Sequence, residues 1–75
     1  LVVPREHIPD AHHVGPEHGD ILAELFTTAQ TVADAEGLSG RGYRLVLNVG
    51  AEAGNTVPHL HLHVMGGRPM AWPPG

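Results

Sequence analysis

Three histidines alternate with apolar residues between His59 and Met65 (His-Leu-His-Leu-His-Val-Met), and this run constrains the fold more than any other. Side chains alternate between the two faces of a β-strand, so the spacing predicts three imidazoles on one face and Leu60, Leu62 and Val64 on the other. Neighbouring imidazoles would lie roughly 6.5 to 7 Å apart, within reach of one small ligand. The pattern therefore indicates a strand that buries one face and offers the other to a phosphate or a metal ion.

The length and composition limit what can surround this strand. Seventy-five residues make at most one domain, and a domain of this size hides only about 60% of its unfolded surface, so its core is small. Cysteine is absent, which excludes disulfides and thiolate zinc sites as additional support. No apolar run reaches membrane-spanning length and no signal peptide is recognisable, so we expect a cytoplasmic protein without a membrane partner.

The charge balance bears on possible partners. The chain has four arginines, no lysine and eight acidic residues, so it offers no basic stripe that could follow a polyanion. This composition disfavours polymeric nucleic acid as a partner and leaves a mononucleotide open.

The rest of the chain combines one helical pattern with short strand patterns. Leu1-Val2-Val3, ended by Pro4, predicts the end of a strand and indicates a chain that lacks its N-terminal part. The segment 16–36 has an apolar stripe of period near 3.6, which predicts one helix ended by Gly37. A second strand is expected at 43–49, and the loop of about seven residues after it predicts an antiparallel connection. These elements form one α+β unit.

Residues outside the triple-histidine run receive simpler interpretations. Asn48, at the end of the 43–49 strand, should lie near the start of the histidine face. His12 and His13 are expected in a solvated loop, since nothing nearby pairs with them at the spacing of metal ligands. His18 is assigned no function.

Three readings of the histidine face remain open. The histidines could simply be a solvated strand face. Two of them, at i and i+2, could hold a zinc ion that a third completes, although i+4 lies far along a straight strand. Alternatively, one imidazole attacks phosphorus while its neighbours bind the phosphoryl oxygens and orient it.

The run His59 to Met65 resembles the signature of the histidine triad (HIT) family, in which three histidines alternate with apolar residues. The continuation 66–75, Gly-Gly-Arg-Pro-Met-Ala-Trp-Pro-Pro-Gly, is similar to the C-terminal end of the Hint branch, and the segment 1–8 to that branch's central strand. The resemblance covers the whole chain, as a HIT domain over 1–75. What it lacks is roughly the first two-fifths of a family member, including strands and much of the purine pocket.

The resemblance implies a fold, an activity and an assembly. The fold is an antiparallel sheet with one main helix, and two protomers join their sheets into one homodimer. The activity is hydrolysis of purine nucleoside phosphoramidates, or of phosphoanhydrides, through a nucleotidyl-histidine intermediate without a required metal or other cofactor.

The resemblance also implies individual roles. His61 matches the nucleophile and His63 the histidine that binds phosphate and handles protons. His59 matches the residue whose carbonyl orients the nucleophile's ring, and His7 matches a fourth, supporting histidine.

Four further positions match residues around the nucleotide. Asn48 matches an asparagine near the 5′ phosphate, while Thr56, where serine is usual, and the Gly54 amide match groups around the phosphate and leaving group. Trp72 matches a residue that reaches the partner protomer's site. Pro58 departs from the family pattern, which has a bulky residue there, and its missing N–H could remove one ladder bond. A nucleotide-binding or interaction module without turnover is the alternative from a different class.

Overall fold

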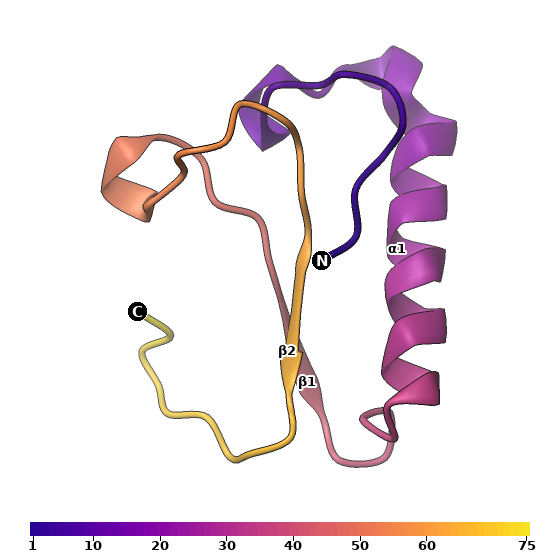
Figure 1. The fold of residues 1–75 in the computed structure, drawn as a ribbon, viewed down its shortest axis with the longest axis vertical. Coiled ribbons are helices and arrows are strands. Elements are labelled where there is room, and N and C mark those ends of the chain that lie inside the picture. The colour runs from indigo at the N-terminus through magenta and orange to yellow at the C-terminus, as the bar shows by residue number, and fades with distance from the viewer.

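The computed structural model describes all 75 residues. It contains three short 3₁₀ turns (η), one α-helix and two strands (Figure 1). In chain order these are η1 (Ala11–His13), η2 (Pro16–His18), α1 (Gly19–Ala35), β1 (Tyr43–Val46), η3 (Ala51–Ala53) and β2 (His63–Gly66). The expected α+β class with one main helix is confirmed. None of these elements is a helix long and apolar enough to span a membrane.

The limits of α1 follow from the residues at its two ends. The helix begins at Gly19 and not at Pro16, because 16–18 forms the 3₁₀ turn η2. Proline has no N–H and is therefore tolerated in a first turn, where that group would have no partner. Gly37 follows the last turn with a φ of +71°, the left-handed conformation that ends helices.

The face that α1 buries is narrower than the apolar stripe in the sequence. Leu25, Ala29 and Ala33, spaced four residues apart, are buried. Phe26 and Val32 belong to the same stripe but are 40% and 38% exposed. The centre of the stripe is therefore fully buried, while Ile21 and Leu22 pack against the core only in part.

The two strands form an antiparallel pair, as the short connection between them predicts. Val46 lies opposite His63 and Tyr43 lies opposite Gly66. Both strands are shorter than expected, because β1 ends at Val46 and not at Val49, and β2 begins at His63 and not at His59. Beyond the pair Val46 and His63 the two segments diverge into the loop that contains η3, so the ladder ends there (Figure 1).

The histidine-bearing segment before β2 pairs with the N-terminal segment instead. Val2 and Leu62 form an isolated antiparallel bridge with two backbone hydrogen bonds of 2.9 Å each, and the Leu60 N–H donates to the Ile8 carbonyl. The strand expected at 1–3 is therefore reduced to a single bridge. Pro58 lies before this pairing begins, so its missing N–H removes no ladder bond.

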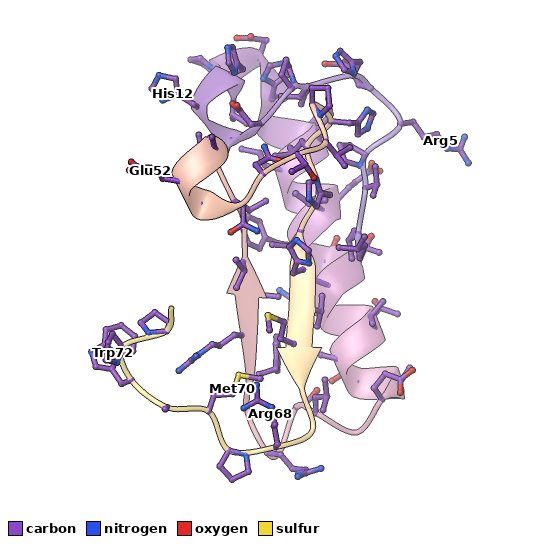
Figure 2. All side chains as sticks on the ribbon, turned by 60° about the vertical axis from the view of Figure 1, so that its left-hand side comes forward. Arg5, His12, Glu52, Arg68, Met70 and Trp72 are labelled. Atoms are coloured by element: carbon purple, nitrogen blue, oxygen red, sulfur yellow. The ribbon has the colours of Figure 1, made fainter.

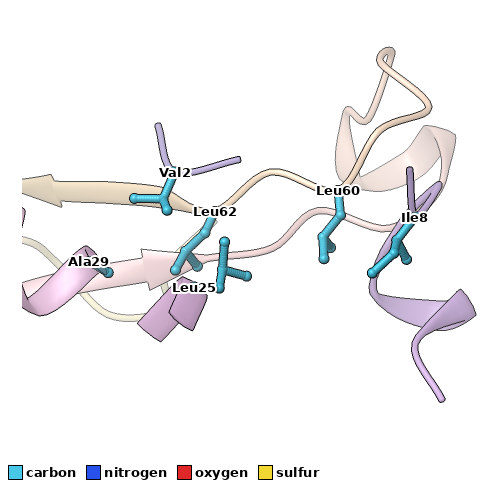
Figure 3. Packing of buried hydrophobic residues seen from close by; sticks show 6 residues of the cluster. All are labelled: Val2, Ile8, Leu25, Ala29, Leu60 and Leu62. Atoms are coloured by element: carbon cyan, nitrogen blue, oxygen red, sulfur yellow. The ribbon is translucent and has the colours of Figure 1, made fainter. Parts of the chain in front are cut away.

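The core lies between α1 and one face of the sheet (Figure 3). Its six buried members come from the N-terminal segment, the helix and the segment before β2, and they are Val2, Ile8, Leu25, Ala29, Leu60 and Leu62. Residues that alternate with Leu60 and Leu62 point to the opposite face, which no helix covers (Figure 1). This uncovered face is where the functional side chains must be sought.

Candidate functional site

The histidines His59, His61 and His63 lie on the uncovered face, as the alternation in the sequence predicts. Leu60 and Leu62, between them, are 2% and 1% exposed in the core, whereas all three histidines are half-buried. The burial of two leucines fixes which way the segment faces, because a slip of one residue would bury imidazoles and expose leucines. Hydrophobic packing on one face thus determines the position of the polar groups on the other.

The ring of His61 is oriented by the backbone next to it. Its Nδ1 lies 2.7 Å from the carbonyl oxygen of His59. A carbonyl oxygen can only accept, so the ring must donate through Nδ1–H. In a neutral imidazole the proton on Nδ1 leaves a lone pair on Nε2. The His61 ring is therefore held in the tautomer that has a free nucleophilic nitrogen at Nε2.

The ring of His59 is fixed from both of its nitrogens. Its Nε2 lies 3.0 Å from the Pro4 carbonyl oxygen, and its Nδ1 lies 3.2 Å from Nδ1 of His7. Because the carbonyl requires a donor, Nε2 carries the proton and Nδ1 of the neutral ring accepts from His7. The two rings are tilted by 59° with centroids 5.2 Å apart. The N-terminal segment therefore supplies two groups that hold His59.

His63 has an unused polar atom inside the site. Its Nε2 is buried and has no hydrogen-bond partner, and its ring centroid lies 5.1 Å from that of His61 at an interplanar angle of 70°. A buried polar atom without a partner costs about 1 to 3 kcal/mol, so such atoms are usually explained by a ligand or a catalytic role. This nitrogen is the one buried side-chain polar atom in the molecule that lacks a partner.

A cavity of about 510 Å³ opens against the three imidazoles. Its other wall is apolar and consists of Leu1, Val3 and Val57. Leu1 and Val3 flank Val2, so the same alternation that buries Val2 directs them toward the histidine face. The volume lies in the range of small-ligand sites, and the site combines a polar wall with an apolar one.

Four residues that the family resemblance assigns to the nucleotide or the partner's site lie outside this cavity. Thr56 lines a neighbouring cavity of about 370 Å³, which shares Val57 with the histidine cavity. The N–H of Gly54 donates to the Ala51 carbonyl at 2.9 Å, so this amide already has a partner within the loop. Asn48 follows the end of β1 and makes no side-chain hydrogen bond. Trp72 is 82% exposed and projects from the C-terminal tail at the side of the molecule, before the chain turns back (Figure 2).

Two of the remaining histidines have structural partners that the sequence did not indicate. Nδ1 of His13 lies 2.6 Å from the Asp10 carboxylate, which also accepts from the His12 N–H and so caps η1. The hydrogen bond from His13 lowers the pKa of the Asp10 carboxyl. Burial acts in the opposite direction, and the charge of His13 and nearby backbone N–H groups lower the pKa further. His12 and His13 are both exposed, as expected, and the hydrogen bond between His13 and Asp10 is a local contact that the sequence did not indicate.

His18 serves the start of α1. Its Nδ1 accepts from the Gly15 N–H at 2.9 Å, and its Nε2 lies 3.3 Å from the Glu6 carboxylate. This side chain therefore joins the loop before the helix to the N-terminal segment. Spacing in the sequence gives no hint of that link, because Glu6 and His18 lie in different irregular segments.

A metal ion would need three converging ligands. No group of three or more histidine, aspartate or glutamate side chains has an arrangement that could hold one. The nitrogens of His59 and the Nδ1 of His61 are engaged with Pro4, His7 and the His59 carbonyl. The metal-binding interpretation therefore lacks a ligand set in this arrangement.

Comparison with known proteins agrees with this geometry. The HIT domain model matches residues 1–70. An uncharacterized HIT-like protein from Synechococcus elongatus is 45% identical over all 75 residues, and a purine nucleoside phosphoramidase from Escherichia coli is 39% identical over 70 residues. The chain spans 65% of the length of the first relative and 59% of the second, and these alignments cover 100% and 93% of the chain.

Solved structures give the same result. A HIT family hydrolase from Legionella pneumophila superposes with a TM-score of 0.93 at 46% identity, covering 97% of this chain and 65% of that one. A HIT family hydrolase from Clostridium thermocellum gives a TM-score of 0.87 at 39% identity, covering 92% and 60%. With the family model matched over nearly the whole chain, this protein belongs to the HIT domain family.

Proposed function

We propose that this protein hydrolyses purine nucleoside 5′-phosphoramidates through a nucleotidyl-histidine intermediate on His61. The observation that carries the proposal is the 2.7 Å contact between Nδ1 of His61 and the His59 carbonyl, because it leaves the Nε2 lone pair available for attack. The purine nucleoside phosphoramidase of Escherichia coli, 39% identical over 70 residues, supports the choice of substrate.

The proposed reaction has two steps. Nε2 of His61 attacks phosphorus in line, a nitrogen–phosphorus bond forms to His61, and the bond from phosphorus to the substrate amine breaks. A proton passes to the leaving amine, which departs neutral. Water then attacks phosphorus, releases the nucleoside monophosphate and restores the free imidazole. Both steps replace one phosphorus substituent by another and need no oxidant, reductant or metal.

The other histidines would support the phosphoryl group and the attacking ring. His63 is proposed to bind a phosphoryl oxygen or hand the proton to the leaving amine, since its buried Nε2 has no partner within the protein. His59 is proposed to orient His61 through its backbone carbonyl, and His7 to hold the His59 ring. The apolar wall of Leu1, Val3 and Val57 would accept the flat face of a base or sugar.

The decisive experiment is to trap the intermediate in the full-length protein that contains this chain. The protein is mixed with adenosine 5′-phosphoramidate and quenched in alkali, because a phosphorus–nitrogen bond to histidine is acid-labile. We expect one nucleotidyl group on the peptide containing His61. An adduct on His59 or His63 would overturn the assignment. His12→Ala is the matched control, since that ring is exposed and lies outside the cavity.

Metal dependence is tested on the same protein. Exhaustive EDTA treatment should leave turnover unchanged, and elemental analysis should find well under one zinc per protomer. Stoichiometric zinc with chelator-sensitive turnover would instead favour metal chemistry.

A nucleotide-binding module without turnover is the second candidate. It is favoured by the Gly54 N–H, which is already bonded to Ala51, and by Asn48 and Thr56, which lie outside the cavity and leave the phosphate to the imidazoles alone. Nucleotide binding without adduct or product would support this alternative.

We further propose a homodimer. The pair β1–β2 has a free outer edge on β1, and free edges are prone to pair with another strand. Trp72, 82% exposed, would pack on the partner subunit, as aromatic anchors commonly do. Light scattering of the full-length protein should give twice the protomer mass at micromolar concentration. A monomer would contradict the proposal.

A further inference from the structure

Three of the four arginines gather where β1 begins and β2 ends, and each donates to a carbonyl of the C-terminal tail. Arg41 donates to Gly67 at 3.3 Å, Arg44 donates to Ala71, and Arg68 donates to its neighbour Pro69. The bonds of Arg41 and Arg44 join residues 26 and 27 positions apart, so they tie the tail back to the start of β1. The bond of Arg68 joins adjacent residues and therefore does not link the tail to another segment.

These guanidinium groups are free to serve the backbone because no carboxylate competes for them. Every ion pair in the molecule is between a histidine and an acid, and none involves an arginine. Arginine has five N–H donors in a rigid fork and remains charged at all relevant pH values, so a bond from it to a carbonyl is stronger than one between neutral groups. The arginines therefore act as donors to the tail and are not neutralised by neighbouring acids.

Arg44 is the one of the three that links the tail to the histidine face. Its partner in the ladder is Met65, and two residues earlier His63 pairs with Val46. Alternation puts Arg44 and Met65 on the same face as His63. The half-buried Arg44 side chain leaves this face to reach the Ala71 carbonyl, immediately before Trp72.

Nothing else in the protomer holds Trp72. The indole is 82% exposed and makes no hydrogen bond, and Figure 2 shows it projecting from the tail at the side of the molecule. The bond from Arg44 is thus the last contact that fixes the backbone before this side chain.

We propose that Arg44 is a positioning residue that fixes Trp72 and thereby the choice among leaving groups. The selectivity part rests on the proposed function and on the proposed homodimer, in which Trp72 packs on the partner subunit. Arg44 holds the Ala71 carbonyl, and the direction in which the chain leaves Ala71 sets where the indole lies. Without this bond the tail samples several directions, so Trp72 discriminates less between a small amine and a bulky one.

The first measurement reports on Trp72 without reference to activity. The full-length protein is labelled with 5-fluorotryptophan, and the ¹⁹F signal of Trp72 is assigned by its loss in Trp72→Phe. In Arg44→Gln we expect this signal to sharpen and move toward that of a free indole, while the melting temperature stays near that of wild type. Arg44→Lys, which keeps the charge but has no planar fork, should give an intermediate signal. Arg5→Gln removes the same charge from a side chain without hydrogen bonds on the far side of the molecule and should change nothing (Figure 2).

The second measurement is selectivity. The ratio of kcat/KM for adenosine phosphoramidates with an aromatic amine and with ammonia as leaving group should shift about three- to tenfold in Arg44→Gln, the range for losing one exposed charge-assisted hydrogen bond. The change should lie mainly in KM for the aromatic substrate, and Arg44→Lys should recover part of it.

The outcomes separate the two proposals. An unchanged Trp72 signal in Arg44→Gln overturns the positioning role, whatever the turnover. A Trp72 signal released by Arg44→Gln in a protein without turnover leaves the anchor in place and overturns the proposed function with its selectivity. A released signal with unchanged selectivity shows that Trp72 does not choose the leaving group and overturns that part of the inference.

Discussion

The two ends of the histidine-bearing segment are held in different ways. At the start, imidazole rings bond to backbone carbonyls of Pro4 and His59, and the leucines between the histidines are buried. At the far end, flexible arginine side chains bond to carbonyls of a tail whose residues are mostly exposed. The first arrangement gives rigid groups in one geometry, and the second permits adjustment. Chemistry at phosphorus needs the first, and discrimination among leaving groups can use the second.

This difference predicts that changes at the histidine end act on the reaction itself. His61→Ala removes the nitrogen that we propose attacks phosphorus but leaves His63 and the apolar wall in place. We expect turnover to fall by about 10³-fold or more and nucleotide affinity to change by about tenfold, or about 1.4 kcal/mol. Single-turnover kinetics and calorimetric titration with AMP measure the two effects. Near-normal turnover in His61→Ala would remove His61 from the proposed mechanism.

The buried leucines should matter to stability more than exposed leucines of the same sheet. Leu62, 1% exposed, packs in the core and bonds to Val2 through its backbone. Leu62→Ala should lower the free energy of unfolding by about 2 to 5 kcal/mol, a large share of the stability of a small domain. Urea denaturation measures the loss. Leu45→Ala is the matched control, because the same change at a side chain 37% exposed should cost much less. Equal losses would show that the histidine face is not fixed by leucine burial.

Removing the His59 ring, which we propose to be supporting, should have a smaller effect than removing His61, the proposed nucleophile. His59→Ala keeps the backbone carbonyl that accepts from His61 but loses the ring contacts to Pro4 and His7. We expect kcat to fall by about tenfold to a hundredfold, since the attacking ring is still present but less well oriented. Comparison of kcat for His59→Ala and His61→Ala checks the order. A His59→Ala protein as inactive as His61→Ala would assign the His59 ring a direct part in the reaction.

The sequence predicts the histidine end better than the tail end for a physical reason. Alternation is a strong signal when every second residue is a buried leucine, and it correctly places Leu60, Leu62 and the three histidines on opposite faces. The antiparallel connection and the helix stop at Gly37 were likewise predictable from local pattern. The ends of the strands were not predictable, because pairing stops where the segments diverge into the η3 loop. The position of that loop depends on tertiary contacts.

Tertiary contacts between residues far apart in the chain could not be predicted from the spacing of residues in the sequence. The Pro4 carbonyl reaches His59 across 55 positions, and Arg44 reaches Ala71 across 27, with no local feature that marks either. The apolar triplet at Leu1 to Val3 was the available signal for the first, since pairing Val2 with Leu62 brings Pro4 close to His59. Backbone acceptors are invisible in a sequence, which is why the Pro4 carbonyl was missed, whereas His7 and the His59 carbonyl were named only through the family resemblance.

The smallest expected effect concerns Asp10, the cap of η1, which lies outside both ends. The hydrogen bond from His13 lowers the pKa of the Asp10 carboxyl below its ordinary value of 3.8, so the folded state favours the ionised form. A lowered pKa adds stability that is present above pH 3.8 and is lost as the pH falls through the folded pKa. Asp10→Asn should therefore lower the urea midpoint slightly at pH 7 and make less difference as the pH falls through the folded pKa, because Asp10 then becomes protonated in wild type as well. Urea titrations at pH 7, 5 and 3 measure the two curves, and His13→Ala should reproduce most of the change at pH 7. Parallel curves for wild type and Asp10→Asn at all three pH values would show that the Asp10 carboxylate contributes nothing to folding.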